Sequence, residues 1–200
     1  MKRSYHHGDL KSALIKAGLD IIAESGIESL TIRSAAQKTG VSHTAPYRHF
    51  GSKDEFLVSI ALDGFEKLAS TVGKNTSASA DGPTEKLAAI CRAYITFAWQ
   101  NREQYRIMFG PYIRDKVKHA DFYGAYDRAF QRLKSVLEEY GRSRKGQQPD
   151  TSMTALAVWS LIHGYSMFLI DNYEDVGGLD DRQVDGIIAH IKRMPDSTKK

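Results

Sequence analysis

Two short helical segments on either side of a single glycine, within residues 31–50, are the feature that most constrains the fold of this chain. Thr31 can cap the N-terminus of the first segment, and Gly40 can end it in a left-handed conformation. Ser42 can then cap the second segment almost at once, so the connection is a tight turn. Ala36 is small enough to let the second segment approach the first. The pattern therefore predicts a helix-turn-helix.

Apolar residues recur at helical spacing through most of the remaining chain, and no stretch shows the alternation of β-branched residues that predicts a strand. The predicted fold is all-α, with an N-terminal three-helix domain and a C-terminal helical bundle, about nine helices in all. The predicted helices cover residues 9–25, 32–38, 42–50, 53–68, 84–99, 104–109, 115–140, 151–172 and 180–193. A polar stretch of small residues predicts a linker at 73–83, between domains at 1–70 and 84–195.

Positive charge is concentrated at the N-terminal end of the chain. Residues 1–50 hold seven lysines and arginines against four aspartates and glutamates, a net charge of +3 out of +4 for all 200 residues. A basic end on a nearly neutral body is typical of a nucleic-acid contact, although a solvated basic surface gives the same composition. Lys2 and Arg3 could enter a minor groove, or belong to a frayed terminus.

The single cysteine, Cys91, excludes an intrachain disulfide and fits a reducing compartment. It lies in an apolar stretch, which favours a buried thiol over a nucleophile. The most apolar run, residues 158–170, is interrupted by polar residues and is too short to span a bilayer. We therefore expect a cytoplasmic protein with no membrane partner, no metal and no cofactor.

Polar and charged side chains gather in the second helix of the predicted helix-turn-helix. They are Ser42, His43 and Thr44 in its first turn, and Tyr47, Arg48 and His49 further along. Short polar groups at the start of an exposed helix can reach base edges in a major groove, and the later side chains would lie at phosphate distance. Lys53, in the first turn of the next helix, places a cation where the helix dipole favours an anion, which indicates a phosphate contact.

Fixed spacings join these residues to others along roughly residues 9–60. The set comprises Gly26, Leu30, Thr31, Ile32, Arg33, Gly40, Val41, Ser42, Tyr47, Arg48, His49, Phe50, Lys53, Phe56 and Leu57. It resembles the N-terminal domain of TetR/AcrR-type regulators. Residues 157–164, with Trp159, His163 and Gly164, further resemble the Trp-His-Gly signature of one C-terminal subtype, and residues 5–10 resemble the same subgroup.

The resemblance implies a sequence-specific transcriptional regulator: a homodimer that represses from a double-stranded DNA operator until an unknown small-molecule effector releases it. It places Ser42, His43 and Thr44 on bases, with Arg33 as a further candidate, and Tyr47, His49, Lys53 and Thr31 on phosphates. Arg48 completes the predicted DNA-binding set. Thr44, Ala45 and Pro46 depart from the common pattern; Ala45 lacks a hydroxyl, and Pro46 falls in the first turn, where few helical hydrogen bonds are lost.

The second domain is rich in large apolar side chains, which suits either a ligand pocket or an ordinary core. The candidate ligand-binding residues are Tyr94, Phe97, Met108, Phe109, Tyr112, Phe122, Tyr126, Phe130 and His163. The resemblance implies a dimer interface made by the last two long helices. Its candidates are Trp159, Leu161, Ile162, Tyr165, Phe168, Leu169 and Ile187, about half of which would be intramolecular core instead.

Two other classes of function remain open at this point. The chain has no His-Glu-x-x-His, no paired cysteines, no phosphate-loop glycines and no nucleophile elbow, so an all-α enzyme is disfavoured. A helical protein-interaction module with a basic face is the second alternative. Binding to random duplex DNA separates it from a DNA-binding protein, whose affinity falls steeply as salt rises.

Overall fold

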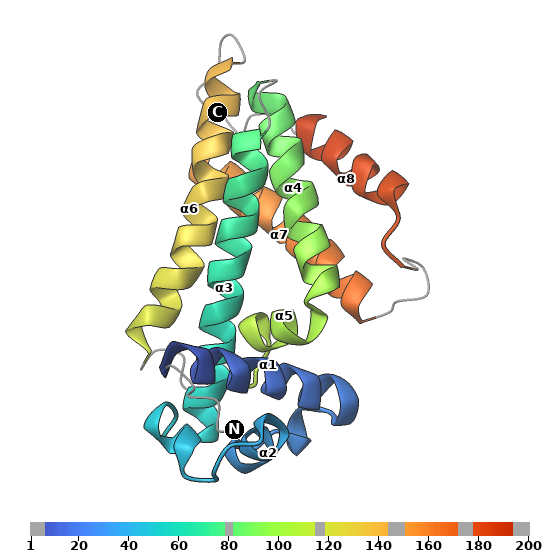
Figure 1. Ribbon diagram of the computed structural model, residues 1–200. Helices are drawn as coiled ribbons and strands as arrows, with labels where there is room; N and C mark the ends of the chain where they lie inside the picture. The colour runs from blue at the N-terminus through green and yellow to red at the C-terminus, as the bar shows by residue number, and fades with distance from the viewer. Residues whose placement is uncertain (1–6, 79–81, 115–118, 144–150, 172–177, 194–200) are drawn as a thin grey trace. The chain divides into compact units, whose positions relative to one another are not determined.

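The computed structural model describes residues 7–78, 82–114, 119–143, 151–171 and 178–193, which form α-helices and two short 3₁₀ helices with no strand among them (Figure 1). The all-α prediction is confirmed. The chain divides into two compact units. The first unit comprises residues 1–64 and 103–123, and the second comprises residues 65–102 and 124–200.

Two helices form the centre of the first unit. Helix α1 (His7–Ser25) packs against α2 (Ile32–Thr39), and the 3₁₀ helix η1 (Ile27–Ser29) joins them. The apolar stripe predicted on α1 is confirmed, since Leu14 and Ala17 are buried at its centre. Burying such a stripe is the main stabilising contribution that an amphipathic helix makes.

The ends of α2 are fixed by hydrogen bonds that the sequence predicts. The backbone N–H of Ser34 donates to Oγ1 of Thr31 at 2.9 Å, and the N–H of Thr31 donates back to Oγ of Ser34 at 2.9 Å. At the other end Gly40 has φ +70°, and its N–H donates to the carbonyl of Gln37 at 3.1 Å. A side chain at Gly40 would be strained in this conformation. Helix α2 therefore begins and ends where the sequence predicts.

The segment after Gly40 is not the α-helix predicted for residues 42–50. Residues 42–44 contain a turn, and a 3₁₀ helix, η2 (Ala45–Arg48), follows. Pro46 explains the difference, because it has no N–H to donate to the carbonyl of Ser42 and it disfavours the α conformation at the preceding residue. The N–H of Ala45 instead donates to the Ser42 carbonyl at 3.1 Å, a spacing of three residues. The sequence interpretation that Pro46 would be harmless to the helix was wrong.

Helix α3 (Lys53–Ala78) begins at the predicted cap but runs further than predicted. The N–H of Glu55 donates to Oγ of Ser52 at 3.1 Å, while the Glu55 carboxylate accepts from the N–H of Gly51 at 2.9 Å. The helix continues to Ala78 and so occupies much of the predicted linker at 73–83. That stretch contains no proline before residue 83, and Val72 is buried just before it, which anchors the helix at that point. Residues 79–81 lie outside the described part of the chain.

Helix α5 (Arg102–Phe109) crosses the first unit's part of α3 closely. A Cβ placed on Gly64 would lie 2.5 Å from Sδ of Met108, so a larger residue here would require the Met108 side chain to move. The buried side chain of Gln104 donates from Nε2 to the Ile60 carbonyl at 2.9 Å and to Oδ2 of Asp63 at 2.7 Å. Packing and polar contacts together hold the short helix on α3.

Helix α4 (Pro83–Gln100) is the centre of the second unit and packs against both α7 (Thr151–Ile170) and α8 (Asp181–Arg193). An ion pair of 2.7 Å between Lys86 and Glu139 joins α4 to α6 (Ala120–Ser143). Arg92 of α4 pairs with Asp181 at 2.8 Å and with Asp185, both on α8. Partly exposed ion pairs of this kind contribute about 0–1 kcal/mol each.

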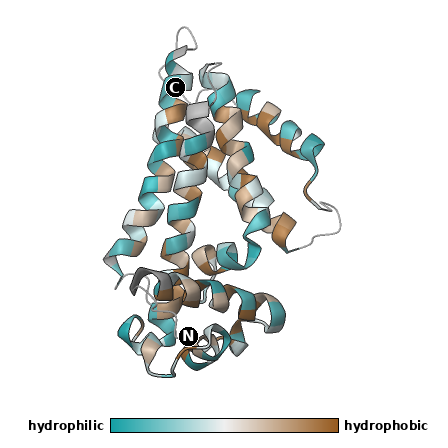
Figure 2. Cartoon of the chain, in the orientation of Figure 1, coloured by the Kyte–Doolittle hydropathy of each residue, from teal (hydrophilic) through white to brown (hydrophobic). Residues whose placement is uncertain are grey.

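Helix α7 contains the longest apolar stretch of the described residues (Figure 2). Residues 152–170 are long and apolar enough to cross a membrane by length and composition alone, so the prediction that this run is too short was wrong. The run is longer because it begins at Ser152, before the stretch considered from the sequence. A core helix passes the same test, and Val158 and Ile162 of α7 are fully buried in the second unit.

Candidate nucleic-acid interface and effector region

The nine residues predicted to contact DNA all lie in the first unit, on the helix-turn-helix or at the adjoining start of α3. Seven are exposed, namely Thr31, Arg33, Ser42, His43, Thr44, Tyr47 and Arg48, and two are half-buried, namely His49 and Lys53. The structure therefore presents most of the predicted set to solvent. Lys2 and Arg3 lie outside the described residues.

Buried anchors hold η2 so that its polar residues face outwards. Pro46 is buried, and Phe50 is buried and stacks on Phe56 with ring centroids 4.5 Å apart. Tyr47, between these anchors, is 57% exposed, and Arg48 is also exposed. A large aromatic side chain with a hydroxyl that is left this exposed has no role in the core, which favours a contact with another molecule.

Short polar side chains fill the turn before η2. The hydroxyls of Ser42 and Thr44 lie 3.3 Å apart, and His43 stands exposed between them in the sequence. Each hydroxyl can donate and accept, and the imidazole can do either according to its tautomer. The turn therefore offers several hydrogen-bonding groups within a few ångströms.

Two of the predicted contacts also have structural roles. The Oγ1 of Thr31 accepts the cap bond from Ser34 and lies 3.1 Å from its Oγ, so this hydroxyl is already engaged within the protein. The ring of His49 is half-buried, with its centroid 6.1 Å from that of Phe50. The sequence predicts the cap role of Thr31, but it does not predict the packing of His49 on Phe50.

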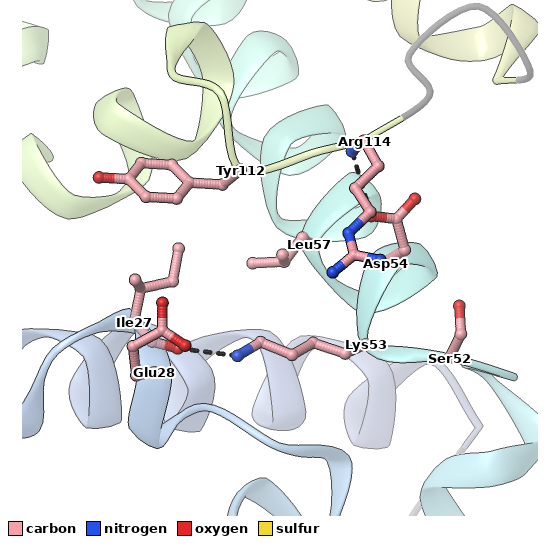
Figure 3. Close-up of a pocket in the computed structure, with 8 residues that line it drawn as sticks. All are labelled: Ile27, Glu28, Ser52, Lys53, Asp54, Leu57, Tyr112 and Arg114. Carbon is pink, nitrogen blue, oxygen red and sulfur yellow. Dashed lines mark hydrogen bonds between the residues drawn. The ribbon is translucent and has the colours of Figure 1, made fainter.

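Lys53 differs from the prediction in where its charge lies. Its Nζ donates to the backbone carbonyl of Ile27 at 3.0 Å, so the ammonium ties η1 to the first turn of α3 (Figure 3). It lies along a cavity of about 400 Å³ that Tyr112 and Arg114 bound on the other side. The N–H of Arg114 donates to Oδ1 of Asp54 at 3.3 Å. The sequence predicts a phosphate contact for Lys53 but not this bond to the Ile27 carbonyl.

The candidate ligand-binding residues are divided between the two units. Those of the first unit are Met108, Phe109, Tyr112 and Phe122, and those of the second unit are Tyr94, Phe97, Tyr126, Phe130 and His163. In the first unit Met108 and Phe122 are buried, Phe109 packs on Tyr105, and Tyr112 is 38% exposed. The sequence pattern did not separate the two groups because eight of the nine lie on helices with similar apolar spacing, and Tyr112 follows one of them.

In the second unit the predicted ligand residues surround Trp159. Its ring lies 5.0 Å from that of Tyr94 and 5.6 Å from those of both Tyr126 and Phe130, in edge-to-face arrangements. The hydroxyl of Tyr94 lies 3.2 Å from Nδ1 of His163. Burial lowers the pKa of His163, so the imidazole is neutral at physiological pH and can accept this hydrogen bond. The cluster is an aromatic core with one polar pair in it.

Most of the residues predicted for a dimer interface are core residues of the second unit. Trp159, Ile162 and Leu169 are buried, and Tyr165 is buried with its hydroxyl donating to Oε1 of Gln183 at 2.9 Å. These four make contacts within one chain, as the sequence predicts for about half of the set. Trp159 meets rings from α4 and α6, and Tyr165 meets α8. Phe168 is 49% exposed, and Leu161 and Ile187 are half-buried.

An exposed apolar surface remains on α7. Met153, Leu156 and Phe168 are all about half exposed, and a Cβ on Gly164 of the same helix would meet no atom within 4 Å. Large apolar side chains left in water in this way mark a protein interaction surface more often than not. Sequence reasoning found Phe168 but missed Met153 and Leu156, which lie within about one turn before residues 157–164.

A second cavity, of about 520 Å³, lies in the second unit between α3 and α4. Lys67 and Thr71 of α3 line one side of it, and α4 contributes Arg92 and other residues. Sequence reasoning missed this groove. The signal was present as small and polar residues at Ala89, Ala93, Thr96 and Gln100, which recur at helical spacing away from the apolar face of α4.

A helix-turn-helix with an exposed polar edge, followed in the chain by an all-helical second unit with an aromatic core, defines the class of regulators that join a DNA-binding module to a sensor domain. A family model for bacterial regulatory proteins of the tetR family matches residues 14–60. A model for the C-terminal domain of Tetracyclin repressor-like proteins matches residues 87–190, more than half of the chain. The chain belongs to the TetR family.

Individual relatives agree with this assignment. The HTH-type transcriptional regulator Rv1816 of Mycobacterium tuberculosis is 26% identical over 110 residues, which are 54% of this chain and 47% of that protein. The chain thus spans about half the length of the curated relatives it matches most extensively. The TetR family transcriptional regulator PfmR from Thermus thermophilus has a TM-score of 0.70 at 21% identity, covering 90% of this chain and 97% of that one. A protein with unknown function from Rhodococcus sp. RHA1 reaches a TM-score of 0.81 at 23% identity, covering 96% and 98%. These two likenesses show the fold.

Proposed function

We propose that this chain is a DNA-binding transcriptional repressor that acts as a homodimer on an operator and is released by a small-molecule effector. The observation that carries the proposal is the exposed edge of residues 42–48, held by the buried Pro46 and Phe50 inside a module that matches the tetR family. The matched relatives are named as transcriptional regulators, and members of this family are not enzymes. The family and the exposed basic edge together favour DNA over a protein partner.

The turn at residues 42–44 and the helix η2 are assigned different contacts with DNA. Ser42, His43 and Thr44 are assigned to base edges, because their short side chains place hydrogen-bonding groups close to the backbone. Tyr47 and Arg48, longer and exposed, are assigned to phosphates, which take most protein–DNA hydrogen bonds. Arg33 is a further base contact from the first turn of α2.

The remaining three predicted contacts are secondary. Thr31 supports the module through the cap bond, and His49 supports it through ring packing on Phe50. Each would bind a phosphate only through a donor group that these contacts do not use. Lys53 uses one of its three donors on the Ile27 carbonyl, which leaves two for a phosphate at the same surface. Because η2 is a short 3₁₀ helix, the phosphate contacts depend on side chains and much less on a helix dipole.

Dimerisation is assigned to the exposed apolar side of α7. Phe168, with Met153 and Leu156 along the same helix, supplies the apolar area, and the open space at Gly164 permits a second helix backbone to approach. Leu161 and Ile187 are half-buried and stand at its edge. Two helix-turn-helix modules related by a two-fold axis would need a spacing of about 34–36 Å to enter successive major grooves.

Effector sensing is assigned to the aromatic core of the second unit. The Trp-His-Gly subtype is supported by the presence of Trp159, His163 and Gly164. In this chain the tryptophan is the centre of the ring cluster, and the histidine forms a polar pair with Tyr94. A ligand that prefers one dimer spacing would change operator affinity by its differential binding, a coupling of about 1–3 kcal/mol. DNA would change effector affinity by the same factor.

The test is selection of bound sites from a random duplex pool, followed by mobility shifts of selected and unselected sequences. Tyr47→Phe should weaken binding to all sequences alike, whereas His43→Ala should change the preferred base at one position, a cost of about 1–3 kcal/mol there. Tyr123→Phe is the matched control, since Tyr123 is 50% exposed in the same unit but lies on α6. No retarded complex for the folded protein at low ionic strength would overturn the proposal.

Salt dependence separates DNA binding from the alternative of a protein-interaction module. Each phosphate that a lysine or arginine neutralises adds about −0.9 to the slope of log affinity against log salt concentration, whereas a neutral phenol adds nothing. Arg48→Gln should therefore make the slope shallower by about one unit, and Tyr47→Phe should leave it unchanged. A slope near zero for the unmodified protein would favour the protein-interaction module.

A further inference from the structure

The cavity between α3 and α4 of the second unit has the chemistry of a binding groove. Its lining residues on α4 run from Ala89 to Asn101, about 18 Å along the helix at 1.5 Å per residue. None of them belongs to the ring cluster around Trp159, although Phe97 is one of the candidate ligand-binding residues above. The groove is therefore distinct from the aromatic cluster assigned above to the effector.

The charged side chains that line the groove are all positive. Lys67 of α3 and Arg92 of α4 both line it, and no aspartate or glutamate is among its lining residues. Between the polar side chains lies an apolar strip of Ala89, Ala93 and Phe97 along the same helix. Cations beside an apolar strip select a ligand that carries an anionic group on an apolar body.

Arg92 also links the groove to α8. Its Nη1 donates to Oδ1 of Asp181 at 2.8 Å, and its Nη2 donates to Oδ1 of Asp185. The two carboxylate side chains are 89% and 65% exposed, so water screens both pairs and each is weak. A ligand carboxylate in the groove could therefore take the guanidinium from the two aspartates, since guanidinium binds carboxylates in a bidentate manner.

We propose that this groove binds an amphipathic carboxylate, a small molecule with one carboxylate and an apolar chain, and that the carboxylate competes with Asp181 and Asp185 for Arg92. Binding then loosens the attachment of α8 to α4, which lie side by side in the second unit (Figure 1). The half-buried Ile187 belongs to α8, so the exchange would also affect the dimer interface, a consequence that rests on the proposed function. The binding itself does not require DNA or dimerisation.

The experiment is calorimetric titration of the full chain with octanoate, with octanol and inorganic phosphate as comparison probes. Octanoate should bind, and both comparison probes should bind roughly tenfold more weakly or not at all. Octanol lacks the carboxylate, and phosphate lacks the apolar chain. Equal affinity for octanol or for phosphate would overturn the proposal. DNA binding measured on the same preparation shows separately whether the proposed function holds.

Variants of Arg92 and of its two aspartate partners should have opposite effects on octanoate affinity. Arg92→Gln should weaken octanoate binding roughly tenfold, whereas the double variant Asp181→Asn with Asp185→Asn should strengthen it, because the internal competitors are gone. Lys86→Gln is the matched control, a paired lysine of α4 that does not line the groove. Its octanoate affinity should be unchanged, and thermal unfolding of each variant confirms that it folds.

Hydrogen exchange provides the second readout. Saturating octanoate should accelerate exchange of α8 amides in the unmodified chain and should have no such effect in the double aspartate variant, where both ion pairs with Arg92 are already absent. If octanoate binds without changing exchange in α8, or binds more weakly to the double variant, the competition for Arg92 is refuted.

Discussion

Replacing Trp159 with alanine separates the two roles that the sequence left open for this residue, core and dimer interface. In the structure Trp159 is 6% exposed and its indole packs edge-to-face against three aromatic rings at 5.0–5.6 Å. Removing a buried tryptophan costs about 3–5 kcal/mol of unfolding free energy, which includes the cavity left behind. About 0.5–1.5 kcal/mol of that loss belongs to each aromatic pair.

The expected shift follows from the size of the chain. At about 2–4 °C per kcal/mol for a chain of this length, Trp159→Ala should lower the Tm by roughly 6–20 °C. Phe168→Ala is the matched variant on the same helix. Phe168 is 49% exposed, so its removal should leave the protomer nearly as stable while weakening self-association.

The assay is calorimetric unfolding at two protein concentrations about a hundredfold apart, with sedimentation to measure association. The Trp159→Ala loss should be the same at both concentrations, because it arises within one chain. The Phe168→Ala loss should shrink on dilution, because stabilisation by the partner subunit then disappears from both proteins by mass action. A Trp159→Ala protein whose protomer stability is unchanged but which no longer associates would refute the assignment of this residue to the core.

Three further predictions concern single side chains. Burial lowers the pKa of His163 below its ordinary value of 6.5, so the unfolded chain binds the proton more readily, and stability should fall as the pH drops from about 6.5 toward the lower native pKa; urea unfolding at pH 7.5 and 5.5 should show a smaller pH effect in His163→Gln. Burial raises the pKa of the Cys91 thiol to about 12, so a thiol reagent at pH 8 should modify it only at the rate at which the chain opens, and rapid labelling of the native protein would contradict this. Thr31→Ala should cost about 0.5–2 kcal/mol in denaturant unfolding through loss of the cap of α2, whereas Thr31→Ser should cost much less, and equal losses would exclude the cap as the cause.

The helical fold was predictable because its signals are local. Thr31 and Gly40 fix the ends of α2 by hydrogen bonds to residues two to four positions away, and glycine is the residue that tolerates a φ of +70°. The long apolar periods of α4 and α7 likewise depend only on neighbouring residues. The end of α3 was missed because polar residues 73–78 resemble a linker, whereas the helix is continued from the buried Val72.

The roles of single side chains were less predictable because they depend on contacts distant in sequence. Lys53 donates to a carbonyl 26 residues away, and Trp159 meets rings from α4 and α6. Apolar periodicity predicts that a residue is covered but does not show whether its own chain or a second copy covers it. For the same reason the sequence left core and ligand roles open for Tyr94 and Tyr126. In the structure both rings pack against Trp159.

Pro46 determines how the recognition segment presents its groups. In a 3₁₀ helix, with three residues per turn, side chains three positions apart align along one side, whereas an α-helix would rotate them apart by about 60°. Thr44, which precedes η2, and Tyr47 within it are three positions apart, and so are Ala45 and Arg48. The hydroxyl of Thr44 and the phenol of Tyr47, which we propose to contact a base and a phosphate, are therefore expected nearly in line. In the row of Ala45 and Arg48, only Arg48 has a polar side chain. Under the proposed function, a base contact and a phosphate contact in one row would let the position of a phosphate fix the register in which a base is read, and operator specificity would then depend on Pro46.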